Sequence, residues 1–245
     1  MLPSVFMSDI GSAVAQVHQR MAAAAARAGR DPSQIELMAV SKTVPPESVR
    51  QAVEAGVGVL GENRVQAAER KISEVGVPVQ WHLIGRLQSN KARLAAALFD
   101  AVHSVDREGL VERLDAGAKA QNKRLDVYVQ VEFVRSELTE HEILSLAERV
   151  CRVVGQAASL HLRGLMTLPP FDPDPEAARP WFRRLSEIRG TLRQATGMEI
   201  PGLSMGMSND FEVAIEEGAT IVRVGTTIFG SRASAVPNLS LTTEA

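Results

Sequence analysis

Short apolar runs alternate with longer amphipathic stretches along almost the whole chain. The short runs are rich in β-branched and other aliphatic residues, which is typical of buried strands in a parallel sheet. The stretches between them place apolar residues three and four positions apart, which predicts helices. We therefore expect eight strands, at residues 35–40, 57–61, 80–84, 101–104, 126–132, 160–166, 201–205 and 221–224.

Helix start and stop signals agree with this alternation. Pro45 and Pro46 suit the first turn of a helix, and the spacings 139/142 and 209/212 match the capping-box pattern of Thr or Asn followed by Glu. Glycines stand where the helices should end, at Gly29, Gly56, Gly76, Gly197 and Gly218. Such strand–helix units predict right-handed crossovers and a parallel sheet.

The number of units favours an α/β fold with a closed sheet. Eight strand–helix units after one extra helix, within 245 residues, match the size of a single (β/α)₈ TIM barrel. A doubly wound open sheet is the alternative, although that fold usually has fewer strands. No linker or repeat divides the chain, so we expect one domain over residues 1–245. Within it, 1–30 would form a helical extension and 233–245 a tail, while the proline-rich stretch 169–175 would be a rim loop.

Charge and cysteine content narrow the function classes. The net charge of −2 gives no basic footprint for nucleic acid. The single cysteine, Cys151, excludes a disulfide framework within the chain, fits a reducing cytoplasm and is expected in the core. Asp9 interrupts the early apolar residues, and no apolar run is long enough to span a membrane. We expect a cytoplasmic protein with neither a nucleic-acid nor a membrane partner.

Lys42 follows directly after the first predicted strand. Lysine is almost never fully buried unless something pairs with it. In a dry setting its neutral amine becomes a nucleophile that can form an imine with a carbonyl compound. The alternative is a lysine whose stem lies on the barrel rim with its ammonium in water. The position alone leaves both interpretations open.

Two neighbouring strand ends carry the marks of an anion site. The loop at residues 204–209 contains Ser208 and leads into a predicted helix, and the eighth strand ends in Gly225 and Thr226. We call Ser208, Gly225 and Thr226 the cradle. Phosphate sites in barrels are often built from the loops after strands seven and eight. Helix capping and tight turning are the alternative explanation for each residue taken singly.

Arg223 and His82 interrupt strands that are otherwise fit for burial. A buried guanidinium needs an acceptor, which would be a bound ligand or a carboxylate such as Glu216 or Glu217. His82 is either a core imidazole bonded to a backbone carbonyl or a ligand contact. A lysine, a phosphate cradle and an adjacent arginine together suit a phosphorylated aldehyde cofactor, of which pyridoxal 5′-phosphate (PLP) is the obvious one. No Cys/His pattern has metal spacing.

The chain resembles the YggS/PROSC family of pyridoxal phosphate homeostasis proteins. Matching segments occur in order through nearly the whole chain, at residues 39–42, 61–66, 81–91, 103–106, 163–168, 203–208 and 223–226. The family is similar in fold to the barrel domain of alanine racemases, fold type III among PLP proteins. The segment 130–137 departs from the family pattern, as does Ala67, where the family often has an acidic residue.

The resemblance implies roles for individual residues. Lys42 would hold PLP as a Schiff base, and the cradle residues Ser208, Gly225 and Thr226 would bind its phosphate. Arg223 would face the pyridine nitrogen, with Asn63 near the ring and His82 close to the site. The resemblance also implies a function in PLP homeostasis, in which the protein buffers PLP and supplies it to apo-enzymes.

The residues favour a carrier over a strong catalyst. PLP withdraws electrons best when its ring nitrogen is protonated, usually by an acidic partner, whereas arginine only donates. Tyr128, the only tyrosine, lies inside the fifth predicted strand, and the chain ends soon after its last strand, with no room for the second β-domain of racemases. We expect a monomer without strong catalysis. A weak amino-acid racemase or other PLP enzyme of this fold type is the first alternative, and a phosphate-binding barrel isomerase without PLP is the second.

Overall fold

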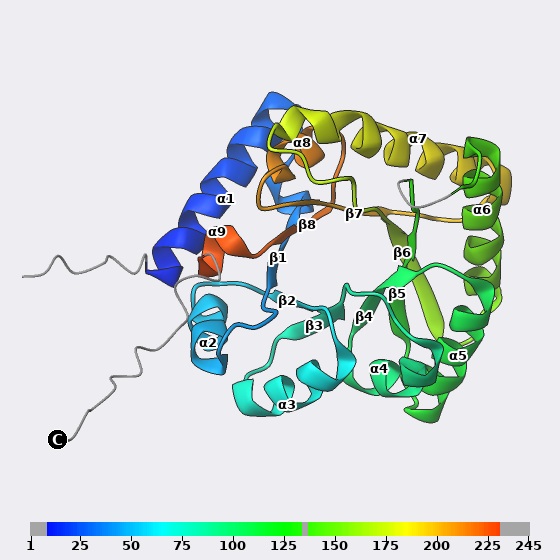
Figure 1. Ribbon diagram of the computed structural model, residues 1–245, viewed down its shortest axis with the longest axis horizontal. Coiled ribbons are helices and arrows are strands. Elements are labelled where there is room, and N and C mark those ends of the chain that lie inside the picture. The colour runs from blue at the N-terminus through cyan, green and yellow to red at the C-terminus, as the bar shows by residue number, and fades with distance from the viewer. Residues whose placement is uncertain (1–8, 134–136, 231–245) are drawn as a thin grey trace, which may run out of the picture.

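Eight parallel strands close into one barrel in sequence order, with helices packed around it (Figure 1). The computed structural model describes residues 9–133 and 137–230, so the predicted tail 233–245 and the first part of the extension 1–30 lie outside the described residues. The first strand pairs with the last, with Met38 opposite Arg223. This closure confirms the predicted (β/α)₈ barrel and excludes the open doubly wound sheet.

The strands are short and mostly buried, as barrel strands are. They are β1 (Glu36–Val40), β2 (Val59–Glu62), β3 (Gln80–Leu83), β4 (Ala101–Val105), β5 (Leu125–Gln130), β6 (Leu160–Met166), β7 (Gly202–Met207) and β8 (Ile221–Val224).

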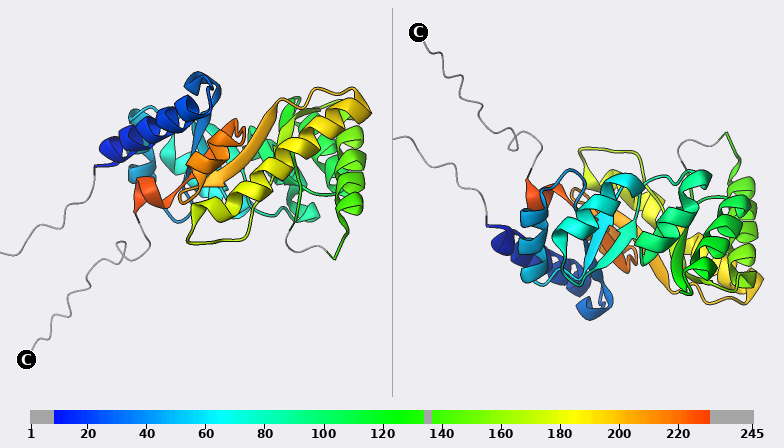
Figure 2. Two further views of the ribbon diagram at one scale, coloured as in Figure 1. Left: turned by 90° about the horizontal axis from the view of Figure 1, so that it is seen from above. Right: turned by 90° about the horizontal axis from the view of Figure 1, so that it is seen from below.

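Helices follow the strands, and one extra helix precedes the first strand. They are α1 (Ile10–Arg27), α2 (Pro46–Glu54), α3 (Val65–Val75), α4 (Ala92–Leu98), α5 (Glu108–Ala120), α6 (Glu140–Gln156), α7 (Arg179–Thr196), α8 (Phe211–Glu216) and α9 (Thr226–Phe229), with 3₁₀ turns η1 (Pro32–Gln34), η2 (Ser89–Lys91) and η3 (Pro175–Ala178). Both side views show α1 on the outside of the barrel, where it packs against α8 and α9 (Figure 2).

β6 and β8 have the predicted bounds, and the other six strands differ from them by one or two residues at one or both ends. β2 was expected at 57–61 but runs from Val59 to Glu62, and β7 was expected to end at Met205 but continues to Met207. In β2 the polar residue Glu62 is buried because Lys71 of α3 pairs with it, so polarity at this position did not mark the end of the strand.

The two predicted capping boxes had opposite outcomes. Thr139 caps α6 reciprocally with Glu142, as expected. The Asn209 box is wrong, because Asp210 occupies the N-cap position of α8 and the Asn209 side-chain amide donates to the backbone oxygen of Asp172 instead. Glu212, the expected partner of Asn209, accepts two hydrogen bonds from Arg20 of α1.

Apolar packing separates into a large outer core and a small interior one. The outer core lies between the barrel and the helices and includes Cys151, which is fully buried as predicted and whose thiol pKa burial raises to about 12. Inside the barrel, Met38, Val59 and Met166 belong to a small separate cluster. Its small size leaves interior positions for polar side chains. No helix within the described ranges is long and apolar enough to cross a membrane.

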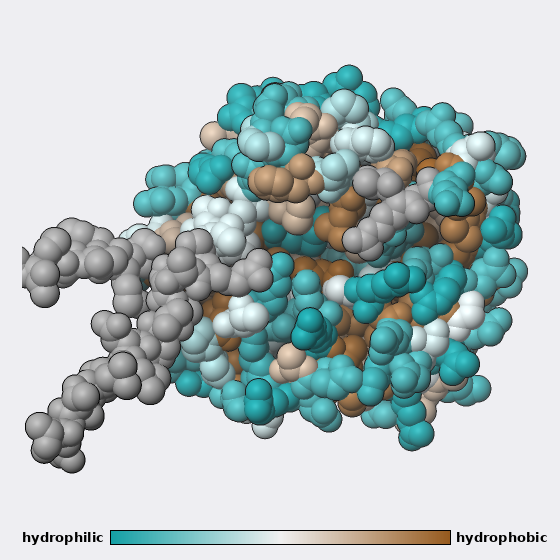
Figure 3. Space-filling view, viewed as in Figure 1, coloured by the Kyte–Doolittle hydropathy of each residue, from teal (hydrophilic) through white to brown (hydrophobic). Residues whose placement is uncertain are grey.

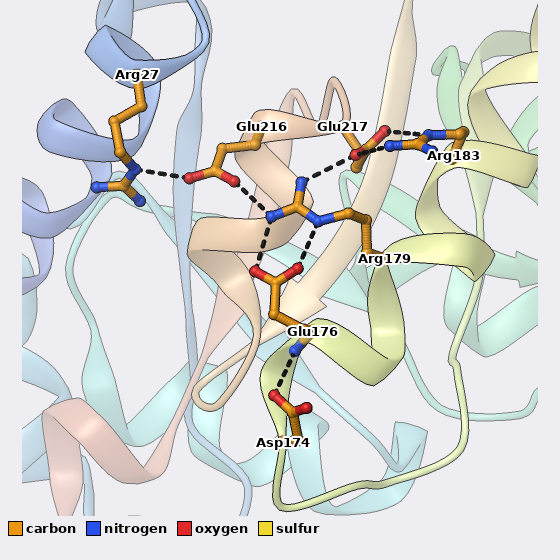
Figure 4. Close-up of polar contacts among 7 residues, drawn as sticks. All are labelled: Arg27, Asp174, Glu176, Arg179, Arg183, Glu216 and Glu217. Carbon is orange, nitrogen blue, oxygen red and sulfur yellow. Dashed lines mark hydrogen bonds and ion pairs between the residues drawn. The ribbon is translucent and has the colours of Figure 1, made fainter.

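One cluster of ion pairs joins η3 and the first residue of α7 to the end of α8 and to α1 (Figure 4). The Arg179 guanidinium contacts three carboxylates, Glu176 at 2.6 Å, Glu216 at 2.7 Å and Glu217 at 2.9 Å. Glu216 also pairs with Arg27 at the end of α1. The cluster therefore uses Glu216 and Glu217, the two carboxylates that were possible partners of Arg223.

Candidate functional site

The carboxyl ends of β7, β8 and β1 lie side by side at one end of the barrel. Ala39 of β1 pairs with Val224 of β8, one residue before Gly225. A side-chain carbon added to Gly225 would lie 3.4 Å from both the Cβ and the carbonyl oxygen of Val40. The predicted cradle therefore adjoins the strand end that leads to Lys42.

A hydrogen bond joins the two halves of the cradle. The Gly225 amide donates to the Ser208 hydroxyl oxygen at 3.1 Å. The Gly225 amide is therefore engaged within the protein and is not a donor that the cradle offers. The hydroxyl proton of Ser208 points elsewhere, and Thr226 and Thr227 open α9, so their amides have no partner within that helix. These groups are the donors that the cradle offers.

The backbone conformation of Gly206 and a hydrogen bond to Asp210 constrain the loop that carries Ser208. Gly206 has a φ of +90°, which side chains rarely adopt, and an added Cβ would lie 2.6 Å from the Cβ of Ala214. The carboxylate of Asp210 accepts a hydrogen bond from the Met207 amide at 2.6 Å, while burial raises the pKa of Asp210. The position of Ser208 is thus fixed before any ligand binds.

Lys42 lies in an exposed turn directly after β1. Thr43, the next residue, has a φ of +63° and donates its hydroxyl to the Lys42 carbonyl oxygen at 2.6 Å. No carboxylate among residues 9–133 and 137–230 forms an ion pair with the Lys42 ammonium. Its amine is therefore available at the mouth of the barrel.

A second lysine near this strand end is fully engaged. The Lys71 ammonium donates to the Glu62 carboxylate at 2.7 Å and to the Ser41 carbonyl oxygen at 2.5 Å. The Ser41 hydroxyl donates to the same carboxylate at 2.8 Å. Together these bonds hold the backbone immediately before Lys42 and distinguish Lys71, as a paired lysine, from Lys42.

Arg223 is buried inside the barrel, with 3% of its surface exposed. Its guanidinium donates to the Ser204 hydroxyl, to the Ser204 carbonyl oxygen and to the Thr167 carbonyl oxygen, each at 2.8 Å. The salt bridge to Glu216 or Glu217, one of the two alternatives considered for Arg223, does not form, because these carboxylates pair with Arg179. Burial lowers the pKa of Arg223 to about 10, so the group is still a cation at neutral pH.

His82 is a core imidazole, but its partner is not the backbone carbonyl that was considered. Its Nδ1 lies 3.1 Å from Nε2 of His103, whose Nδ1 lies 2.9 Å from the Ser204 hydroxyl. Burial lowers the pKa of His82 to about 4 and that of His103 well below its ordinary value. Both imidazoles are therefore neutral at physiological pH.

Asn63 follows β2 and lines a cavity of about 800 Å³. Some of the other wall residues, such as Ile84, Gln130 and Leu168, follow or end β3, β5 and β6, and others belong to α6. The face drawn in Figure 3 shows hydrophobic residues at its centre inside a hydrophilic rim. Of the predicted site residues only Asn63 lines this cavity. The cavity therefore does not contain Lys42 or the cradle, which lie at the ends of β1, β7 and β8.

Sequence reasoning missed the residues that support the site. Ser204 and His103 lie in the matching segments 203–208 and 103–106 but had no predicted role, and the pair of Glu62 and Lys71 was not predicted. The one available signal was polarity inside apolar strands, as with Arg223. Within the described ranges, no group of three or more His, Cys, Asp or Glu side chains could hold a metal ion.

Comparison with known proteins identifies the family. The family model "Alanine racemase, N-terminal domain" matches residues 13–233. A pyridoxal phosphate homeostasis protein of Pseudomonas aeruginosa is 42% identical over 236 residues, covering 94% of this chain and 99% of the relative. The chain belongs to the family of pyridoxal phosphate homeostasis proteins.

Solved structures agree with this family assignment. PipY of Synechococcus elongatus, solved with PLP bound, is 35% identical with a TM-score of 0.76, covering 87% of this chain and all of that one (100%). An alanine racemase of Clostridium difficile has a TM-score of 0.68 at 13% identity, covering 92% of this chain and 56% of that one. The second likeness concerns the fold alone. The resemblance inferred from the sequence segments is confirmed.

Proposed function

We propose that this chain binds PLP and serves in its homeostasis, holding the cofactor and supplying it to apo-enzymes. The observation that carries the proposal is the adjacency of β7, β8 and β1, which brings the cradle beside the strand end of Lys42. Family membership and the PLP-bound relative support the same conclusion.

The residues fit the three parts of the cofactor. PLP supplies an aldehyde that condenses with a primary amine and a pyridine ring that can withdraw electrons. Lys42 offers an amine that forms no ion pair within residues 9–133 and 137–230, and the cradle offers a hydroxyl from Ser208 together with donors at Thr226. Gly225 allows the close approach of the two loops. Arg223 is a fixed cationic donor for the ring nitrogen.

The two remaining predicted residues, Asn63 and His82, have different roles. Asn63 borders the cavity next to the cradle, where its amide would contact the ring. His82 lies in the barrel interior and acts through His103 and Ser204 rather than at the mouth. We assign it to the support of Arg223 rather than to direct contact.

We further propose that the protein is a carrier and not a strong catalyst. Arg223 stays protonated at neutral pH and can only donate, so it would favour an unprotonated ring nitrogen in bound PLP and weaken the electron withdrawal by the ring. Tyr128 is buried against His103 with ring centroids 4.0 Å apart, and burial raises its pKa to about 12, which opposes its use as a base. The proposed residues all come from one chain, which suits a monomer. The single buried cysteine suits the cytoplasm.

The decisive experiment adds PLP to the purified protein and records the visible absorbance of an imine. Borohydride reduction followed by peptide mapping should place the label on Lys42. Lys42→Ala should abolish the band, and Lys119→Ala, which removes an exposed lysine of α5, should leave it intact. A colourless protein, or a label on Lys71, would contradict the proposal.

Two assays separate the carrier from the alternatives. Mixing the loaded protein with an apo-transaminase should restore transaminase activity. Turnover of D- or L-alanine well above the Lys42→Ala control would instead establish a racemase. A protein that binds inorganic phosphate but not PLP would indicate the phosphate-binding isomerase class.

A further inference from the structure

A continuous line of polar side chains crosses the barrel interior. It runs from Arg223 on β8 to Ser204 on β7, then to His103 on β4 and His82 on β3. These side chains are 0–5% exposed. Branched apolar residues usually fill the interior of such barrels, so four hydrogen-bonded polar side chains in this position need a specific reason.

The chemistry of the first member sets the direction of the line. A guanidinium has five N–H donors and no acceptor, so the Ser204 oxygen accepts from Arg223. The Ser204 proton is then directed to Nδ1 of His103, 2.9 Å away, which accepts. A neutral imidazole that accepts at Nδ1 carries its proton on Nε2, and this Nε2 lies 3.1 Å from Nδ1 of His82. His82 therefore accepts at Nδ1 and also carries its proton on Nε2.

The opposite direction is less favourable. His82 would donate to His103, and His103 would donate to Ser204. The Ser204 oxygen would then accept from both His103 and Arg223, and its own proton would lose the acceptor that His103 provides. A buried donor without an acceptor costs about 1–3 kcal/mol. The forward direction gives the hydroxyl proton its partner, so it is preferred.

The surroundings keep the line neutral apart from Arg223. His103 stacks on the buried ring of Tyr128, and its charge would face His82 and Arg223. Arg163 disfavours a charge on His82, and Asp210 is the carboxylate that favours the charge of Arg223. Protonation of either histidine is therefore disfavoured by burial and by repulsion from a neighbouring cation.

We propose that Ser204, His103 and His82 form a one-way hydrogen-bond chain whose protons all point away from Arg223, and that this chain positions the guanidinium as a permanent donor to the cofactor ring. The second part rests on the proposed function. The three residues are positioning residues, because they act through Arg223. The chain has no proton that it can deliver toward the ring nitrogen.

The direction is tested on the protein without cofactor. Nitrogen-15 NMR of the histidine side chains at neutral pH should show both His82 and His103 with Nδ1 unprotonated and Nε2 protonated. A proton on Nδ1 of either residue, or an imidazolium at neutral pH, would overturn the chain. This measurement needs no variant and does not depend on whether PLP binds.

The positioning role is tested with matched serine variants. Ser204→Ala should weaken PLP binding about tenfold, the usual effect of losing a hydrogen bond to a charged group, and should release the fixed tautomer of His103. Ser104→Ala removes an equally buried hydroxyl that donates to the Gly85 carbonyl oxygen and is not part of the hydrogen-bond chain. It should change neither the PLP affinity nor the His103 tautomer. Unchanged PLP affinity in Ser204→Ala would overturn the positioning role.

A second pair of variants tests His103 itself. His103→Asn keeps an acceptor near the Nδ1 position, whereas His103→Leu has a similar size and none. Asparagine should retain more PLP affinity than leucine, and equal losses would contradict the role of the acceptor. If wild-type protein shows no imine absorbance, the proposed function fails while the tautomer result still decides the direction of the chain.

Discussion

The Ser41 hydroxyl donates to the buried carboxylate of Glu62, and Ser41 is the residue directly before Lys42. Lys71 completes the contact by bonding to both the carboxylate and the Ser41 carbonyl oxygen. An ion pair between β2 and α3 therefore holds the backbone from which the proposed PLP lysine extends.

Lys71→Met should destabilise the protein by about 3 kcal/mol, because it leaves the Glu62 carboxylate buried without its partner. Urea unfolding measures the change. The double variant Lys71→Met/Glu62→Leu should recover part of the loss, since it removes the unpaired charge as well. A double variant less stable than the sum of the two single changes would contradict this explanation.

Gly85→Ala should displace the segment after β2, because the new Cβ would lie 2.1 Å from the Asn63 carbonyl oxygen. We expect a loss of stability of several kcal/mol and weaker PLP binding, measured by denaturant unfolding and by titration of the imine absorbance. Gly109→Ala in α5 is the control, since its Cβ would meet nothing within 4 Å. That change should be neutral or slightly stabilising. Similar effects of the two substitutions would refute the role of the close contact.

The buried histidines should make stability rise with pH between about 4 and 6.5. Their folded-state pKa values are lowered, that of His82 from 6.5 to about 4, so the unfolded chain binds more protons in this window. Stability is then complete above pH 6.5 and is lost as the pH falls, by up to about 1.4 kcal/mol per pH unit for each histidine. Chemical unfolding at several pH values measures the slope, and His103→Asn should reduce it. An unchanged slope would show that His103 titrates normally.

The cluster around Arg179 should lose its contribution in acid. The side-chain hydrogen bonds to Arg179 and Arg183 lower the pKa of Glu216 and Glu217 below the ordinary 4.5. Their contribution is therefore complete above about pH 4.5 and disappears as the pH falls through the lowered values. Arg179→Met should reduce the melting temperature at neutral pH, and the difference from wild type should shrink in acid. A difference independent of pH would point to lost packing of the arginine stem instead.

The barrel could be predicted because its signals are local. Each strand appears as a short apolar run and each helix as a periodic stretch, and these patterns record which face is buried. The shared location of Lys42 and the proposed cradle at strand ends could be predicted for the same reason, since strand ends are visible in the sequence and parallel strands place their carboxyl ends at one end of the barrel. The local pattern mispredicted the capping role of Asn209 because its side chain bonds to Asp172, which is distant in the sequence.

The amino-acid sequence by itself determined the eight strand–helix units, the residues at each strand end and the presence of a cation within β8. The tertiary structure decided the partners of those residues. Ser204 meets His103 across 101 positions of the chain, and Arg223 reaches Thr167 across 56. Such pairs depend on the register at which the barrel closes, and that register is set by the packing of the whole fold. No local pattern encodes which interior side chains then come within hydrogen-bonding distance.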